Sequence, residues 1–151
     1  MNPMDEIASK LTSRSLRQLL EYTNRESGRY VATVGIPRHF TMGAYQRYGN
    51  YRRRSSSYTK RKNKKFGHTN PNEYTGALRE IVLVTAVAGV TATQYGFRVK
   101  AKGTSKHKLW RHTREELEAV SSAEPKEYSA VWQKIFRANA GTSRFPFRKR
   151  K

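Results

Sequence analysis

The sequence predicts a small α+β fold, in which an antiparallel β-sheet is packed by an N-terminal helix and by C-terminal helices. Two patterns support this prediction. Apolar residues recur every three or four positions near both ends of the chain, whereas the middle contains branched runs and alternating segments that are typical of strands. The length of 151 residues favours one domain. We expect this domain to span residues 1–143 and a basic C-terminal arm, mobile in the isolated protein, to span 144–151.

The first predicted element is a helix over residues 4–22. Ile7 and Leu11 lie on one face at helical spacing. Asp5 and Glu6 come in the first turn, where negative charge complements the helix dipole. These features together favour an amphipathic helix that packs on the rest of the domain.

Three strands are predicted next. Residues 29–37, RYVATVGIP, alternate in polarity and end at Pro37, which cannot continue a sheet ladder. Residues 78–102 are expected to form two more strands, because the segment ALREIVLVTAV is rich in branched side chains and the segment YGFRVKAK alternates. The economical arrangement of these two strands is an antiparallel hairpin that turns near Gly89.

The last third of the sequence predicts helices. Thr113-x-x-Glu116 and Ser121-x-x-Glu124 both match the capping box, and Pro125 follows where a first helical turn tolerates proline. Gly141 is a plausible C-terminal cap. An apolar stripe at three- and four-residue spacing between them predicts a buried face. The expected core residues of this stripe are Val131, Trp132, Ile135 and Phe136.

Net charge indicates the class of partner. The chain has 31 basic and 11 acidic residues, so its formal net charge is +20. A compact protein with this charge repels itself unless a polyanion compensates it. Nucleic acid is the favoured polyanion, and an anionic membrane is disfavoured because no basic amphipathic helix stands out. The longest apolar run, IVLVTAVAGV, is too short to span a bilayer.

The positive charge is concentrated in residues 52–68, RRRSSSYTKRKNKKFGH, which include eight basic residues and no acidic one. We expect a long basic loop over about 49–72. Interleaved aromatic residues favour a loop or short helix that packs locally, with its basic groups facing outward. Tyrosines in this segment could instead stack on unpaired bases, although packing is favoured. The candidate residues facing nucleic acid or a neighbouring subunit are Arg52, Arg53, Arg54, Lys60, Arg61, Lys62, Lys64, Lys65, Arg148, Lys149, Arg150 and Lys151.

No catalytic motif is present in the sequence. The P-loop, the nucleophile elbow and the zinc-protease motif are absent. The chain lacks cysteine, which excludes disulfides and thiolate metal sites. The histidines are better explained as surface or phosphate-facing groups than as metal ligands, and the carboxylates at 115–127 as helix caps or solvated side chains. We therefore expect neither enzyme activity, nor a metal, nor a cofactor.

Residues 45–83 contain Tyr58 with the basic Lys62 and Lys64, then Gly67-His68, then the step Thr75-Gly76-x-Leu78. The order of these features resembles that in the head–tail joining, or tail-completion, proteins of tailed bacteriophages. Similarity extends loosely over residues 36–137. A tyrosine with a basic run, a Gly-His turn and a Thr-Gly-x-Leu step make up the similar pattern. The matching residues are Tyr58, Lys62, Lys64, Gly67, His68, Thr75, Gly76 and Leu78.

This resemblance implies a virion structural protein of the phage neck, assembled in the host cytoplasm. Its implied partners are copies of itself in a ring (hexamer or dodecamer), other neck, portal-adaptor or tail proteins, and packaged DNA touched by nonspecific contacts. The alternative is a sequence-nonspecific nucleic-acid-binding protein, such as a ribosome-associated protein, which fits the charge equally well. A nuclease is the third reading, although no metal-binding acidic cluster is visible in the sequence.

Overall fold

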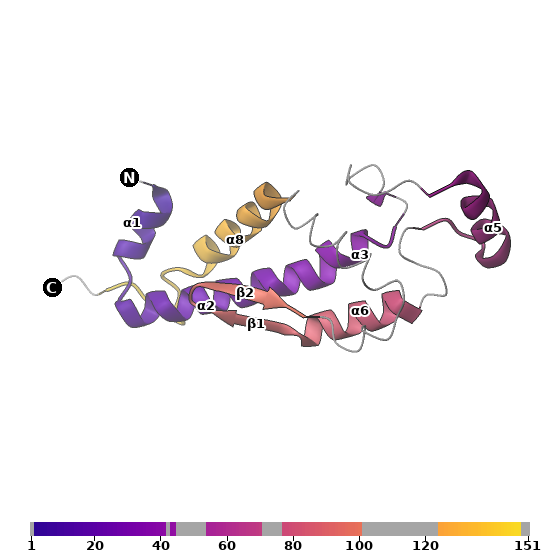
Figure 1. The fold of residues 1–151 in the computed structure, drawn as a ribbon. Coiled ribbons are helices and arrows are strands. Elements are labelled where there is room, and N and C mark those ends of the chain that lie inside the picture. The colour runs from indigo at the N-terminus through magenta and orange to yellow at the C-terminus, as the bar shows by residue number, and fades with distance from the viewer. Residues whose placement is uncertain (1, 42, 45–53, 71–76, 101–123, 149–151) are drawn as a thin grey trace.

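The computed structural model describes residues 2–41, 43–44, 54–70, 77–100 and 124–148. Over these residues the chain has a small α+β fold, as the sequence predicts. A long helix forms the axis of the molecule, with a two-stranded hairpin and the C-terminal helix packed along it (Figure 1). The remaining elements extend from the two ends of this axis.

The predicted N-terminal helix is present but interrupted. It consists of α1 (Pro3–Ser9) and the much longer α2 (Ser13–Tyr30). Thr12 separates them, because it has an extended backbone and its side chain caps α2 by accepting a hydrogen bond from the Ser15 amide at 3.1 Å. The helix α2 therefore starts independently of α1, and its buried face does not continue that of α1.

The strand predicted at 29–37 is wrong, because the helix continues through this segment. A π-helical stretch, η1 (Val31–Gly35), is followed by one short turn, α3 (Ile36–Arg38). Gly28, Ala32 and Gly35 are buried at helical spacing. A Cβ on Gly28 would lie 2.8 Å from Val90 Cγ1. These small residues let neighbouring elements approach the helix closely. This tertiary packing favours a helical conformation, although the alternating pattern alone favours a strand.

The first strand predicted within 78–102 is also wrong, since α6 (Ala77–Ala88) is a helix. Val82 and Ala86 are buried one turn apart, and Val82 packs in a small core with Phe40 and Ile36. The branched residues therefore form a helix here, because apolar side chains one helical turn apart face an apolar neighbour. A branched run of this length cannot be distinguished from a buried strand by periodicity alone.

The hairpin is shorter than predicted and turns elsewhere. Its strands are β1 (Val90–Thr93) and β2 (Gly96–Val99), which pair antiparallel from Val90↔Val99 to Thr93↔Gly96. The turn therefore lies at residues 94–95 and not near Gly89. Gly89 ends α6 instead, and its carbonyl accepts a hydrogen bond from the Lys100 amide at 3.2 Å.

The C-terminal helix α8 (Pro125–Asn139) has proline in its first turn, as predicted. Phe136 is 2% exposed, and Trp132 stacks on it with ring centroids 5.2 Å apart. Val131 and Ile135 are half-buried. The predicted capping boxes lie outside the described residues, except that Glu124 stands at the N-cap position without capping the helix through its side chain.

The described part of the predicted C-terminal arm, residues 144–148, packs against the domain. Phe145 is buried in the same core as Leu11 and Phe136. Gly141, which follows α8 with a φ of +77°, allows the chain to turn back, as its predicted role as a cap requires. Beyond it, Phe147 pairs with Leu11 in an isolated β-bridge.

Candidate nucleic-acid interface

The centre of the predicted basic loop is a helix, α5 (Ser56–Phe66). The Ser55 side chain caps its start by accepting a hydrogen bond from the Tyr58 amide at 3.3 Å. Gly67 ends it in the left-handed conformation, with a φ of 72°, which glycine adopts without steric cost. Figure 1 places α5 at one end of the molecule, apart from α2 and α8. Of the two forms that the sequence left open, this part of the segment has the helical one.

The helix α5 has two chemically different faces. Tyr58, Thr59 and Phe66 are half-buried, and Lys62 is only 5% exposed. At about 100° per residue these four positions lie within roughly 100° of one another around the helix. The other side is exposed and basic. We call it the α5 outer face, and it consists of Lys60, Arg61 and Lys64. Lys65 is exposed too, but it lies at the edge of the half-buried face, about 20° from Tyr58 around the helix.

Lys62 departs from the prediction. Its ammonium group is buried and donates a hydrogen bond to the backbone carbonyl of Asn70. It therefore helps to hold the segment after α5 against the helix. Arg54, immediately before the cap, is half-buried. Arg52 and Arg53 lie outside the described residues.

Arg148, the described member of the basic C-terminal residues, does not join the α5 outer face. Arg148 donates from its backbone amide to the Lys10 carbonyl and from Nε to the Leu11 carbonyl, both at 2.8 Å. These bonds attach the end of the chain to the junction of α1 and α2, at the opposite end of the molecule from α5 (Figure 1). Its role in the described structure is thus to fix the tail. Lys149, Arg150 and Lys151 lie outside the described residues.

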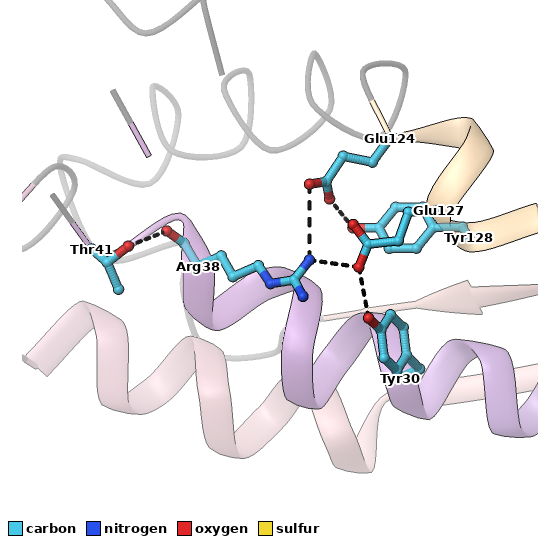
Figure 2. Close-up of polar contacts among 6 residues, drawn as sticks. All are labelled: Tyr30, Arg38, Thr41, Glu124, Glu127 and Tyr128. Atoms are coloured by element: carbon cyan, nitrogen blue, oxygen red, sulfur yellow. Dashed lines mark hydrogen bonds and ion pairs between the residues drawn. The ribbon is translucent and has the colours of Figure 1, made fainter. Parts of the chain in front are cut away.

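A polar cluster that sequence reasoning missed joins α3 to the start of α8. Figure 2 shows Arg38 reaching toward the carboxylates of Glu124 and Glu127. Arg38 Nη1 lies 2.7 Å from Glu127 Oε1 and 3.9 Å from Glu124 Oε1. The hydroxyl of Tyr30 donates to Glu127 at 2.6 Å, and that of Tyr128 donates to Glu124 at 2.9 Å. Charge-assisted hydrogen bonds therefore link α3 and α8, two elements that are distant in the sequence.

The π-helix brings Tyr30 and Arg38 closer to one line along the helix. These residues are eight apart, which in a regular α-helix would separate them by about 80° around the axis. A π turn holds one more residue than an α turn, as the bond from the Ile36 amide to the Val31 carbonyl records. The two residues are therefore placed as if seven apart, where they share a face.

The electrostatics of this cluster favour a structural role. The hydrogen bond that the Tyr30 hydroxyl gives to Glu127 raises the pKa of Tyr30, with burial adding to the effect. A tyrosine shifted in this direction keeps its proton and acts as a donor. The sequence assigned Glu124 to capping and Glu127 to a cap or solvated position, but both side chains face Arg38. No sequence signal pairs them with a residue 89 positions away from Glu127.

The described residues contain no group of three His, Cys, Asp or Glu side chains that could hold a metal ion. Within the same part of the chain, none of the helices is long and apolar enough to cross a membrane. In comparisons with known proteins, no protein-family model, curated protein or solved structure matches the chain.

Proposed function

We propose that this protein is a non-enzymatic structural component of a virus particle, a subunit of the neck ring that joins head and tail. In this proposal a basic surface faces packaged DNA and another surface contacts the neighbouring copy. The observation that supports it is the separation of charge along the chain. Residues 52–68 include eight basic residues and no acidic one, whereas residues 77–97 include one basic residue, Arg79, and one acidic residue, Glu80, so their net charge is zero.

The neutral segment also exposes apolar side chains. Val84 and Val87 on α6 are 67% and 44% exposed, and Tyr95 at the tip of the hairpin is 90% exposed. Val84 and Val87 are three residues apart and share one face of α6 with the exposed Ala88. We call this face the α6 outer face.

A second copy of this chain is the occupant that the charges favour for the α6 outer face. Two chains with a net charge of +20 repel each other over most of their surface. The α6 outer face carries no basic residue, and the exposed Glu80 lies beside it, one turn before Val84. A contact through this face limits the repulsion and removes apolar area from water. The basic helix α5, in contrast, is suited to a polyanion. The two surfaces together suit a subunit that assembles with itself beside nucleic acid.

Protein mass spectrometry on nuclease-treated, density-purified virus particles from the source tests the proposal. A neck subunit is expected at a few copies in each particle. Absence from particles, with cosedimentation of the chain with ribosomes or free nucleic acid, would instead support the nucleic-acid-binding alternative. That alternative relies on the same basic segment but needs no self-assembly.

Self-assembly is tested separately by light scattering on the purified protein. Val84→Lys and Val87→Lys each place a charge on the α6 outer face, so we expect either change to shift the assembled species toward monomer. Ala130→Lys is the matched control, because it adds the same charge at an exposed position of α8. A wild-type chain that stays monomeric at all concentrations, or an equal effect of Ala130→Lys, would contradict the assigned contact.

A further inference from the structure

We infer that α5 binds the phosphodiester backbone of a double-stranded nucleic acid through Lys60, Arg61 and Lys64, without reading or stacking on the bases. This inference rests on the proposed function, in which nucleic acid is the polyanion beside the protein. It goes further by naming the form of nucleic acid, the residues that contact it and the kind of contact.

Phosphate contact follows from the orientation of the helix. Lys60, Arg61 and Lys64 are exposed, and none of them forms an ion pair with another described residue. At about 100° per residue they lie within an arc of roughly 100°. From residue 27 to residue 72 the sequence has no acidic residue that could offset their field. Three like charges on one rigid face therefore present a continuous anion-binding surface.

Base stacking is disfavoured by the position of the aromatic residues. A stacking platform requires a ring whose face is open to an unpaired base. Tyr58 and Phe66 are half-buried on the side of α5 opposite the α5 outer face. The ring of Phe66 also contacts neighbours, with Lys65 Nζ 5.3 Å and the His68 ring 6.3 Å from its centroid. These rings consequently support the helix from beneath.

The spacing and rigidity of the basic groups favour a duplex. Lys60 and Lys64 are one helical turn apart, about 6 Å along the axis. One strand of a duplex presents a phosphate about every 3.4 Å along its axis, so this pair spans roughly two phosphates. The two strands together present twice that charge density. A straight helix face can lie along such a regular array, whereas a flexible single strand gains most from stacking sites, which α5 does not offer.

Fluorescence anisotropy with the full chain and a labelled DNA duplex of arbitrary sequence tests the inference. The variant combines Lys60→Gln, Arg61→Gln and Lys64→Gln, because glutamine keeps helix propensity while removing charge. Three lost phosphate contacts should make the slope of log K against log salt concentration less steep by about 2.7. A second duplex of different sequence should give the same slope and affinity.

The matched control combines Lys126→Gln, Lys134→Gln and Arg137→Gln, which removes two lysines and one arginine from exposed positions of α8. We expect this control to keep most of the wild-type slope of log K against log salt concentration. An equal loss in both variants would overturn the assignment to α5, because the binding would then follow total charge alone.

Further probes separate the possible ligands. An RNA duplex of the same sequence shows which kind of duplex binds more tightly, and tight binding of either supports the inference. Tighter binding of the DNA single strand, or of vesicles containing anionic lipid, would overturn it. So would a several-fold loss of affinity in Phe66→Leu with an unchanged circular dichroism spectrum. Particle composition is measured independently, so a chain found in particles that binds no duplex would refute this inference and leave the proposed function standing.

Discussion

Asn24 links three elements of the fold, and a double-mutant cycle tests this link. Its side chain accepts a hydrogen bond from Trp132 Nε1 of α8 at 2.7 Å and donates one to the Thr93 carbonyl of β1 at 2.8 Å. Asn24 is 6% exposed, so water replaces these bonds poorly when the amide is removed. Each bond contributes about 0.5–1.5 kcal/mol to stability. Asn24→Ala should therefore lower the free energy of unfolding by about 1–3 kcal/mol.

The second change is Trp132→Phe, which removes the indole N–H while keeping a ring to stack on Phe136. The coupling energy between Asn24→Ala and Trp132→Phe should be about 1 kcal/mol, because the bond between them is lost only once in the double variant. Urea unfolding followed by circular dichroism measures all four free energies. Asn24→Ala combined with Lys60→Gln on α5 is the control pair and should be additive. A coupling energy within about 0.3 kcal/mol of zero would refute the reasoning.

Three further predictions concern the packing of α8. Phe136→Ala should cost about 3–5 kcal/mol in urea unfolding, because the ring is buried in the main core, and a cost below about 1 kcal/mol would mean that it faces solvent. The raised pKa of Tyr30 predicts a stability contribution that is complete below the unfolded pKa of about 10 and is lost as pH rises through the folded pKa. Tyr30→Phe should therefore lose less stability than wild type as pH rises, when the free energy of unfolding is measured by urea titration at alkaline pH. An equal pH dependence in the two proteins would show that the bond to Glu127 is not coupled to folding. Gly35→Ala would place a Cβ 2.6 Å from Tyr128 Oη, so we expect a loss of about 1–3 kcal/mol by thermal or urea unfolding, and an unchanged midpoint would show that α8 yields freely.

Much of the candidate interface could be predicted from the sequence, because charge does not depend on the fold. Lys60, Arg61, Lys64 and Lys65 were identified as basic groups facing outward, and they are exposed. The run of charge did not show that Lys62 turns inward. The phase of a short helix depends on which residues find a packing partner, and the distant partner is not visible in the local pattern.

Secondary structure was predictable where the pattern had one interpretation. The amphipathic repeat of the N-terminal segment and the stripe of α8 both formed helices. Residues 29–37 and α6 were wrongly expected to be strands, because short branched runs suit a buried strand and a buried helix equally well. Burial of Val82 beside Phe40, and the close approach of Tyr128 to Gly35, favour the helical form in each case.

The sequence by itself determined the composition of the surfaces: a strongly basic segment without acidic residues, a neutral segment rich in branched residues, and an apolar stripe at each end of the chain. Only the tertiary structure decided how these parts are oriented. It placed the aromatic residues of α5 beneath its basic groups and tied Arg38 to Glu127 across 89 positions of sequence. The physical reason is that charge and hydrophobicity belong to single residues, whereas helical phase, burial and ion pairing depend on neighbours that are distant in the chain.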